Sequence, residues 1–94
     1  RVINIDLPNV EARESIFGVY CRNLPMKDNI DTRKLAISSE GFSGAEIKSV
    51  VTEAAMTAIS EGRDSCHEDD FSSAMVKVRE KRDSGVESPD ELYG

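Results

Sequence analysis

The sequence predicts an all-α fold, a small four-helix bundle with a short strand before it and a flexible tail after it. Three observations predict this class. Apolar residues recur at helical spacing in four separate stretches. Residues that favour helix starts and stops bound these stretches. Only one short stretch alternates as a strand does, so the chain cannot build a sheet of its own.

Residues 2–7 alternate apolar and polar side chains, the pattern of a short strand that Pro8 ends. Because no second strand is visible, we expect this strand to belong to a sheet upstream. The chain also begins with Arg1 rather than methionine. Both observations favour a piece of a longer protein.

The first helix is expected over residues 10–22, with Asn9 as its N-cap. One apolar stripe of this helix faces the core. Ile16 and Tyr20 stand four residues apart and form a second stripe beside it. The second stripe is wider than burial alone requires, which makes it a candidate binding surface.

A short second helix is expected after Asp31, which can cap it. Leu35 and Ala36 are predicted to point inward from this helix. The polar and glycine residues over 38–41 should end it.

The third helix is expected over residues 44–61. Ser43 and Glu46, three residues apart, form a capping box in which each side chain takes a backbone N–H of the helix start. Gly41 and Gly44 leave the main chain bare at this point. A bare helix N-terminus lets a ligand come close, so this junction is the most informative stretch of the chain.

The fourth helix is expected over residues 68–81, with acidic residues in its first turn and basic residues in its last, as the helix dipole favours. Its apolar stripe comprises Phe71, Ala74, Met75 and Val78. Residues 83–94 change to glycine, serine, proline and acidic residues, which predicts a flexible tail.

The overall composition excludes several functions. The 94 residues carry a net charge of −6, with 18 acidic and 12 basic residues, which argues against nucleic acid and against an anionic membrane face. No apolar run approaches membrane-spanning length. Cys21, Cys66 and His67 show no metal-ligand spacing, so we expect reduced thiols and no metal site. No second group pairs with the histidine, and no catalytic residue is predicted.

The order of several short motifs resembles the small C-terminal helical lid of AAA ATPases. The segments that carry the resemblance are Arg1-Val2-Ile3-Asn4-Ile5-Asp6-Leu7-Pro8, Glu11-Ala12-Arg13, the stretch from Ile16 to Leu24, Gly41-Phe42-Ser43-Gly44-Ala45-Glu46-Ile47, Glu53-Ala54-Ala55-Met56, and Asp70-Phe71 with Ala74. Proteasome-activating ATPases look most similar, and the valosin-containing-protein type is also similar. The resemblance implies a strand or linker remnant of the large ATPase domain over 1–8, a lid domain over 9–82 and a tail over 83–94.

In that family the lid folds over the adenine of a nucleotide held by the large domain. The resemblance puts Gly44 and Ala45 against the adenine, and Ile16 and Tyr20 along the wall of the same pocket. Family members commonly carry histidine where this chain has Tyr20. Other branches place an arginine in this region to sense the γ-phosphate. Ala45 and Glu46 stand there instead, so the site should contact the base rather than the phosphates.

The resemblance also implies the setting of the intact protein. It would bind ATP or ADP with Mg²⁺, assemble with neighbouring subunits into a hexameric cytoplasmic ring and unfold protein substrates. This chain has no glycine followed by lysine and therefore no P-loop, so it should neither hydrolyse ATP nor bind nucleotide alone. The ending Leu92-Tyr93-Gly94 resembles the C-termini of proteasome-activating ATPases, which dock in pockets of the 20S proteasome core.

Three alternative hypotheses remain open at this point. The chain could be an AAA lid without proteasome docking, or a plain helical protein-interaction module. Gly41-Phe42-Ser43-Gly44 also fits the GxxG loop with which KH domains clamp single-stranded nucleic acid. Acidic residues flank this loop on both sides, and a KH domain needs a three-stranded sheet, so this third hypothesis is disfavoured.

Overall fold

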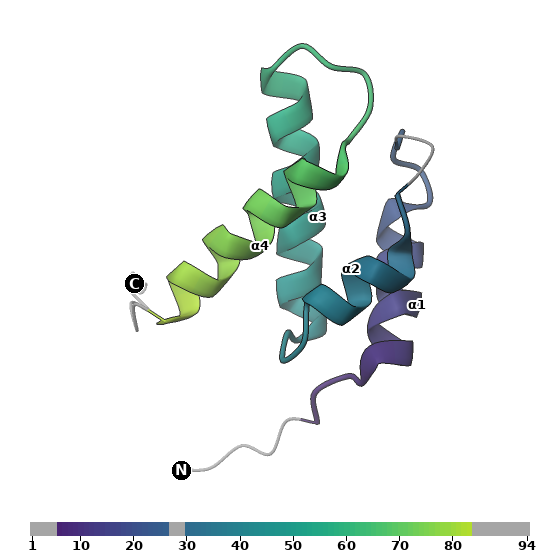
Figure 1. Cartoon of the computed structure of the whole chain (residues 1–94), viewed down its shortest axis with the longest axis vertical. Coiled ribbons are helices and arrows are strands. Elements are labelled where there is room, and N and C mark those ends of the chain that lie inside the picture. Colours follow the sequence, from purple (N-terminus) through teal and green to yellow (C-terminus); the bar gives the residue numbers. More distant parts are fainter. Residues whose placement is uncertain (1–5, 27–29, 84–94) are drawn as a thin grey trace.

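Four helices make up the computed structural model, which describes residues 6–26 and 30–83 (Figure 1). Their bounds are α1 Val10–Cys21, α2 Thr32–Ser38, α3 Gly44–Ser60 and α4 Glu68–Asp83. The predicted all-α class is confirmed, and the described ranges contain no strand. Most of the strand expected over 2–7 lies outside them.

The longest helix, α3, is the centre of the arrangement. It packs against α4 on one side and against α1 on the other, while α2 packs on α1 (Figure 1). None of the helices in the described ranges combines the length and apolar character that crossing a bilayer requires. The site expected between the first and third helices therefore falls at a direct helix–helix contact.

Three phenylalanines form the middle of the core, one from α1, one from the loop before α3 and one from α4. Phe17, Phe42 and Phe71 are all fully buried. The inward direction predicted for Leu35 and Ala36 is confirmed, since both are buried. The loop phenylalanine anchors the segment that leads into α3, which fixes where this helix begins.

The helix starts follow the predicted caps. Oδ1 of Asn9 accepts from the N–H of Ala12 at 2.9 Å, and the side chain of Asp31 accepts from the N–H of Arg33. α1 ends one residue earlier than expected, and α4 continues to Asp83, two residues further than expected. These caps hold each short helix at a defined register.

A buried arginine that the sequence analysis did not single out ties the chain before α1 to the end of α2. Arg13 is only 6% exposed. Its Nε donates to the carbonyl of Ala36 at 2.8 Å, and its Nη1 donates to the carbonyl of Pro8 at 2.9 Å. The segment that enters the bundle is therefore fixed to the bundle itself.

The loop between α3 and α4 is held by a two-point ion pair. Nη1 of Arg63 donates to Oδ2 of Asp70 at 2.7 Å, and Nη2 donates to Oδ1 at 2.8 Å. The N–H of His67 also donates to Oδ2. These hydrogen bonds, chiefly the one from Arg63, hold the pKa of Asp70 below its ordinary value.

This ion pair predicts how stability depends on pH. A carboxyl whose pKa is lowered by folding stabilises the protein above its unfolded value of about 3.9, and the contribution is lost as pH falls through the folded value. Asp70→Asn should therefore unfold at lower urea than the parent at pH 7. The difference should begin to shrink as the pH falls below about 4, and it should approach zero only below the lowered pKa of the folded state, where the parent also carries a neutral side chain.

The exposed neighbour Asp69 supplies the control. Asp69→Asn should leave the urea midpoint nearly unchanged at both pH values. An Asp70→Asn difference that stays constant down to low pH would contradict the assigned role of the carboxylate.

Candidate functional site

Two residues predicted from separate segments lie side by side at the contact between α1 and α3. A Cβ atom placed on Gly44 would lie 3.9 Å from Cδ1 of Ile16 and would meet no nearer atom outside its own helix. The glycine is the first residue of α3, and the isoleucine is in the middle of α1. Packing between the two helices thus places a bare stretch of main chain next to an apolar side chain.

The side chain of Tyr20 follows on the same stripe of α1. It is 41% exposed, so its ring is half-buried and its surface is open on one side. Ser15, Ile16, Val19 and Tyr20 line a shallow hollow of about 200 Å³. The second stripe predicted for the first helix is therefore a largely apolar surface that is open at Tyr20, while Ile16 is partly buried and packs against the core.

The start of α3 is closed by the predicted capping box. Oγ of Ser43 accepts from the N–H of Glu46 at 3.2 Å, and Oε1 of Glu46 accepts from the N–H of Ser43 at 2.9 Å. Within the part of the chain that the structure describes, the N–H groups of Gly44 and Ala45 have no protein acceptor. Ala45 is also exposed. Two backbone donors therefore remain available to a ligand at this helix start.

The charge of Glu46 is compensated inside the protein. Nε of Arg82 donates to its Oε2 at 3.0 Å, and Nη2 donates to its Oε1 at 3.3 Å. Ala45 and Glu46 were expected to direct the site to the base rather than the phosphates, because a carboxylate at a helix start repels phosphate. Its pairing with an arginine weakens that repulsion, and the available donors beside it are neutral amides.

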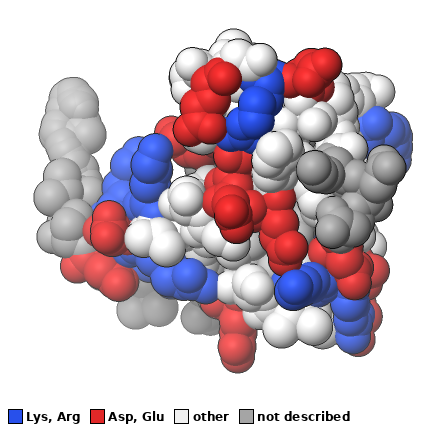
Figure 2. All heavy atoms as spheres, turned by 45° about the horizontal axis from the view of Figure 1, so that its top comes forward, with Lys and Arg blue, Asp and Glu red and all other residues white. Residues whose placement is uncertain are grey.

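Acidic and basic side chains alternate over the surface that Figure 2 draws, without a broad area of one sign. Phe42, the second residue of the Gly41–Gly44 loop, is fully buried. The described residues also form no three-stranded sheet. The buried phenylalanine and the lack of a three-stranded sheet in the described ranges do not fit the KH hypothesis, which requires such a sheet.

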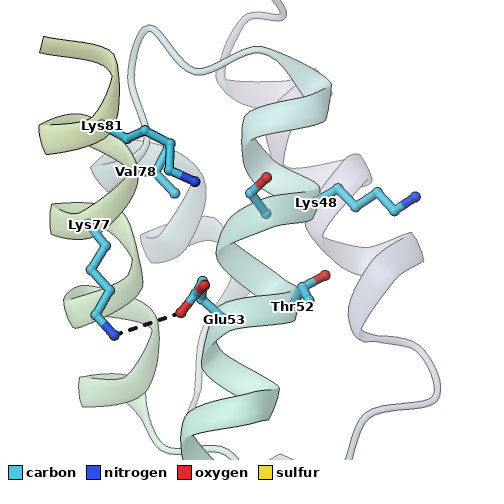
Figure 3. Close-up of a pocket in the computed structure, with 7 residues that line it drawn as sticks. Lys48, Thr52, Glu53, Lys77, Val78 and Lys81 are labelled. Atoms are coloured by element: carbon cyan, nitrogen blue, oxygen red, sulfur yellow. Dashed lines mark ion pairs between the residues drawn. The ribbon is translucent and has the colours of Figure 1, made fainter. Parts of the chain in front are cut away.

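A larger hollow lies elsewhere, between α3 and α4 (Figure 3). It has a volume of about 330 Å³ and is crossed by an ion pair of Lys77 with Glu53 at 3.7 Å. Its lining comprises Lys48, Ser49, Thr52, Glu53, Lys77, Val78 and Lys81. Neither Ile16 nor Gly44 lines it, so its size alone does not make it the predicted site.

The two cysteines are buried and reduced. Burial, with Cys66 nearby as a second cause, raises the pKa of Cys21 to about 11. The pKa of Cys66 is also raised by burial. Both are therefore thiols at neutral pH, which makes them poor nucleophiles. Across residues 6–26 and 30–83 no cluster of potential ligands could hold a metal ion.

Comparison with known proteins gives this geometry a context. A family model described as the AAA+ lid domain matches residues 29–73. The proteasome-activating nucleotidase of Saccharolobus islandicus (strain Y.N.15.51 / Yellowstone #2) is 40% identical over 84 residues, which are 89% of this chain and 21% of that protein. The chain belongs to the AAA+ lid domain family.

Other archaeal relatives of this AAA+ lid match in the same way. The proteasome-activating nucleotidase of Methanopyrus kandleri is 43% identical over 83 residues, covering 88% of this chain and 19% of that protein. The one from Methanocella arvoryzae is 37% identical over 86 residues, covering 92% and 21%. The resemblance to lids of proteasome-activating ATPases is thus confirmed. The chain spans about a fifth of the length of the curated relatives it matches.

The structure brings together only part of the predicted set. Ile16, Tyr20, Gly44 and Ala45 come from α1 and the start of α3, whose packing against each other brings the isoleucine next to Gly44. The predicted docking residues Leu92, Tyr93 and Gly94 lie outside the described residues. Arg82, the partner of the capping box, was not predicted from the sequence, although the basic residues in the last turn of its helix were.

Gly44 is not required by the fold, and this can be measured. Its φ is not positive and a Cβ would make only an ordinary van der Waals contact. Gly44→Ala should therefore raise the free energy of unfolding by about 0.4–1 kcal/mol, because alanine restricts the unfolded chain. Gly41 has a φ of +86°. Gly41→Ala should instead lower that free energy by about 1–2 kcal/mol.

Urea unfolding of both variants checks this contrast. A Gly44→Ala variant as destabilised as Gly41→Ala would mean that the bundle itself needs the glycine.

Proposed function

We propose that this chain is the lid of a hexameric ATPase and closes over the adenine of a nucleotide held by the large domain of the same subunit. The single observation that carries the proposal is that Gly44 lies beside Ile16, since a Cβ built on the glycine would be 3.9 Å from Cδ1 of the isoleucine. The lid family and the relatives' names support the setting. The proposal names four residues of the adenine site: Ile16, Tyr20, Gly44 and Ala45.

The chemistry of these residues suits a purine. The N–H groups of Gly44 and Ala45 can donate to ring nitrogens, which are acceptors. The absence of a side chain on the glycine lets a flat ring approach the main chain. Ile16 offers an apolar wall, and the half-exposed ring of Tyr20 can stack on the base. The site would hold the base, while ATP or ADP with Mg²⁺ keeps its phosphates in the large domain.

The lid would then transmit the state of the nucleotide. Closure over ATP and opening after hydrolysis change the angle between lid and large domain, and the outer face of the lid carries this movement to the neighbouring subunit. In a ring of such subunits the movement would unfold and thread protein substrates. The relatives that match are named proteasome-activating nucleotidases, and the same setting is proposed for the protein that carries this chain.

Replacing the glycine tests the adenine site. In the full-length ATPase, Gly44→Val should weaken ATP binding about tenfold, or about 1.4 kcal/mol, because a branched side chain stands where the base would rest. Isothermal titration calorimetry measures the affinity. The matched control is Gly18→Val, since a Cβ on the exposed Gly18 meets open space. Equal affinities for the two variants would contradict the site.

The proposal extends to proteasome docking through the end of the sequence. Leu92-Tyr93-Gly94 lies outside the described residues, so this part rests on the sequence and on the relatives' names. A hydrophobic residue followed by a tyrosine can insert together into a pocket of a partner protein. Docking in the pockets between α-subunits of the 20S core would open its gate.

Tyr93→Ala should abolish gate opening while leaving the melting curve unchanged. The cleavage of a fluorogenic peptide by 20S core particles measures the gate, and Ser88→Ala in the same tail serves as control. Full peptide cleavage with Tyr93→Ala would favour the alternative function, an AAA lid that does not dock on the proteasome.

A further inference from the structure

The last turns of α4 are attached to the bundle by polar contacts. No residue of this helix after Met75 is fully buried, and Val78 is only partly buried. Lys77 pairs with Glu53 across the groove of Figure 3, and further along the helix Arg82 pairs with Glu46. Two arginines of these last turns, Arg79 and Arg82, contact the segment that leads into α3.

Both arginines lie over the loop that leads into α3. Their Cζ atoms are each 5.1 Å from the centroid of the Phe42 ring, within the range of a cation–π contact. Nη2 of Arg79 also donates to the carbonyl of Ser38 at the end of α2. The loop between α2 and α3 is thus held from the side of α4 as well as by its own buried ring.

Arg82 also contacts the carboxylate that closes the capping box. Its Nε donates to Oε2 of Glu46, while its Nη2 donates to Oε1, the same oxygen that accepts the N–H of Ser43. A guanidinium fork fixes both oxygens of a carboxylate in one plane. The Glu46 side chain is 27% exposed. Without the guanidinium of Arg82, its carboxylate would bond to water in place of the N–H of Ser43.

We propose that Arg82 is a positioning residue for the main chain of Gly44 and Ala45, acting through Glu46. The inference rests on the proposed function, because it concerns the same adenine site. The arginine touches no nucleotide. It holds the carboxylate that fixes the first turn of α3, and the first turn sets the direction of the two available N–H groups. The end of α4 thereby controls the geometry of a site formed by α1 and α3.

The alternative role of the Arg82–Glu46 ion pair is charge compensation without any effect on the main chain. Positioning and charge compensation predict different binding results. If Arg82 orients the main chain, its loss weakens binding of adenosine and of ATP by the same factor, because both present the same base. If it only neutralises Glu46, its loss weakens ATP and leaves uncharged adenosine unaffected.

The test compares Arg82→Gln with Lys77→Gln in the full-length ATPase. The control removes the ion pair of Lys77 with Glu53, which also joins α3 to α4, and leaves the capping box intact. Hydrogen–deuterium exchange of the nucleotide-free protein should be faster in peptides covering residues 43–47 of Arg82→Gln only. Affinities for ATP and adenosine, measured by competition, should both fall by about two- to fivefold, the range that a partly exposed ion pair supports. Arg82→Lys should recover part of the loss.

Three results would overturn the inference: unchanged exchange over 43–47, faster exchange without loss of affinity, or a loss confined to ATP. Gly44→Val in the same assays separates these from a failure of the proposed function. If Gly44→Val weakens binding and Arg82→Gln does not, the adenine site stands and the positioning role falls. If Gly44→Val leaves binding unchanged, the adenine site itself is wrong.

Discussion

The carboxylate of Glu46 is the point on which the site depends. One oxygen closes the first turn of α3 by accepting the N–H of Ser43, and both oxygens accept from the guanidinium of Arg82. The turn that it closes begins with Gly44, beside Ile16 of α1. A single side chain thus connects the end of α4 to the contact between α1 and α3. Since a helix start otherwise frays, this is what gives bare main chain a fixed direction.

Features that depend on neighbours in sequence were predictable. Ser43 and Glu46 are three residues apart, so their mutual capping follows from the sequence alone, and Asn9 and Asp31 act as the expected caps. Apolar periodicity also predicted that Leu35 and Phe71 would be buried. The predicted ends of α1 and α4 differ from the observed ends by one and two residues. An exposed last turn such as that of α4 has no buried side chain to mark where the helix stops.

Features that depend on distant residues were not predictable from spacing. Arg82 is 36 residues from Glu46, and Arg13 is 23 residues from Ala36. A basic last turn and an arginine in a first helix have many possible partners, and only the packing of the helices selects one. The closeness of Ile16 and Gly44 likewise came from family resemblance and not from periodicity. Resemblance carried that information because it includes the tertiary contacts of other lids.

The buried arginine also limits where a lid of this kind can bend. Arg13 bonds to the carbonyl of Pro8 and to that of Ala36, so the chain from Pro8 onward belongs to the bundle. Within the bundle α1 and α3 share a core of close-packed apolar side chains, which does not deform gradually. Any movement of the proposed adenine site would therefore carry the chain from Pro8 onward with it. The bundle would then turn as one body, carrying Ile16 and Gly44 together toward the base or away from it.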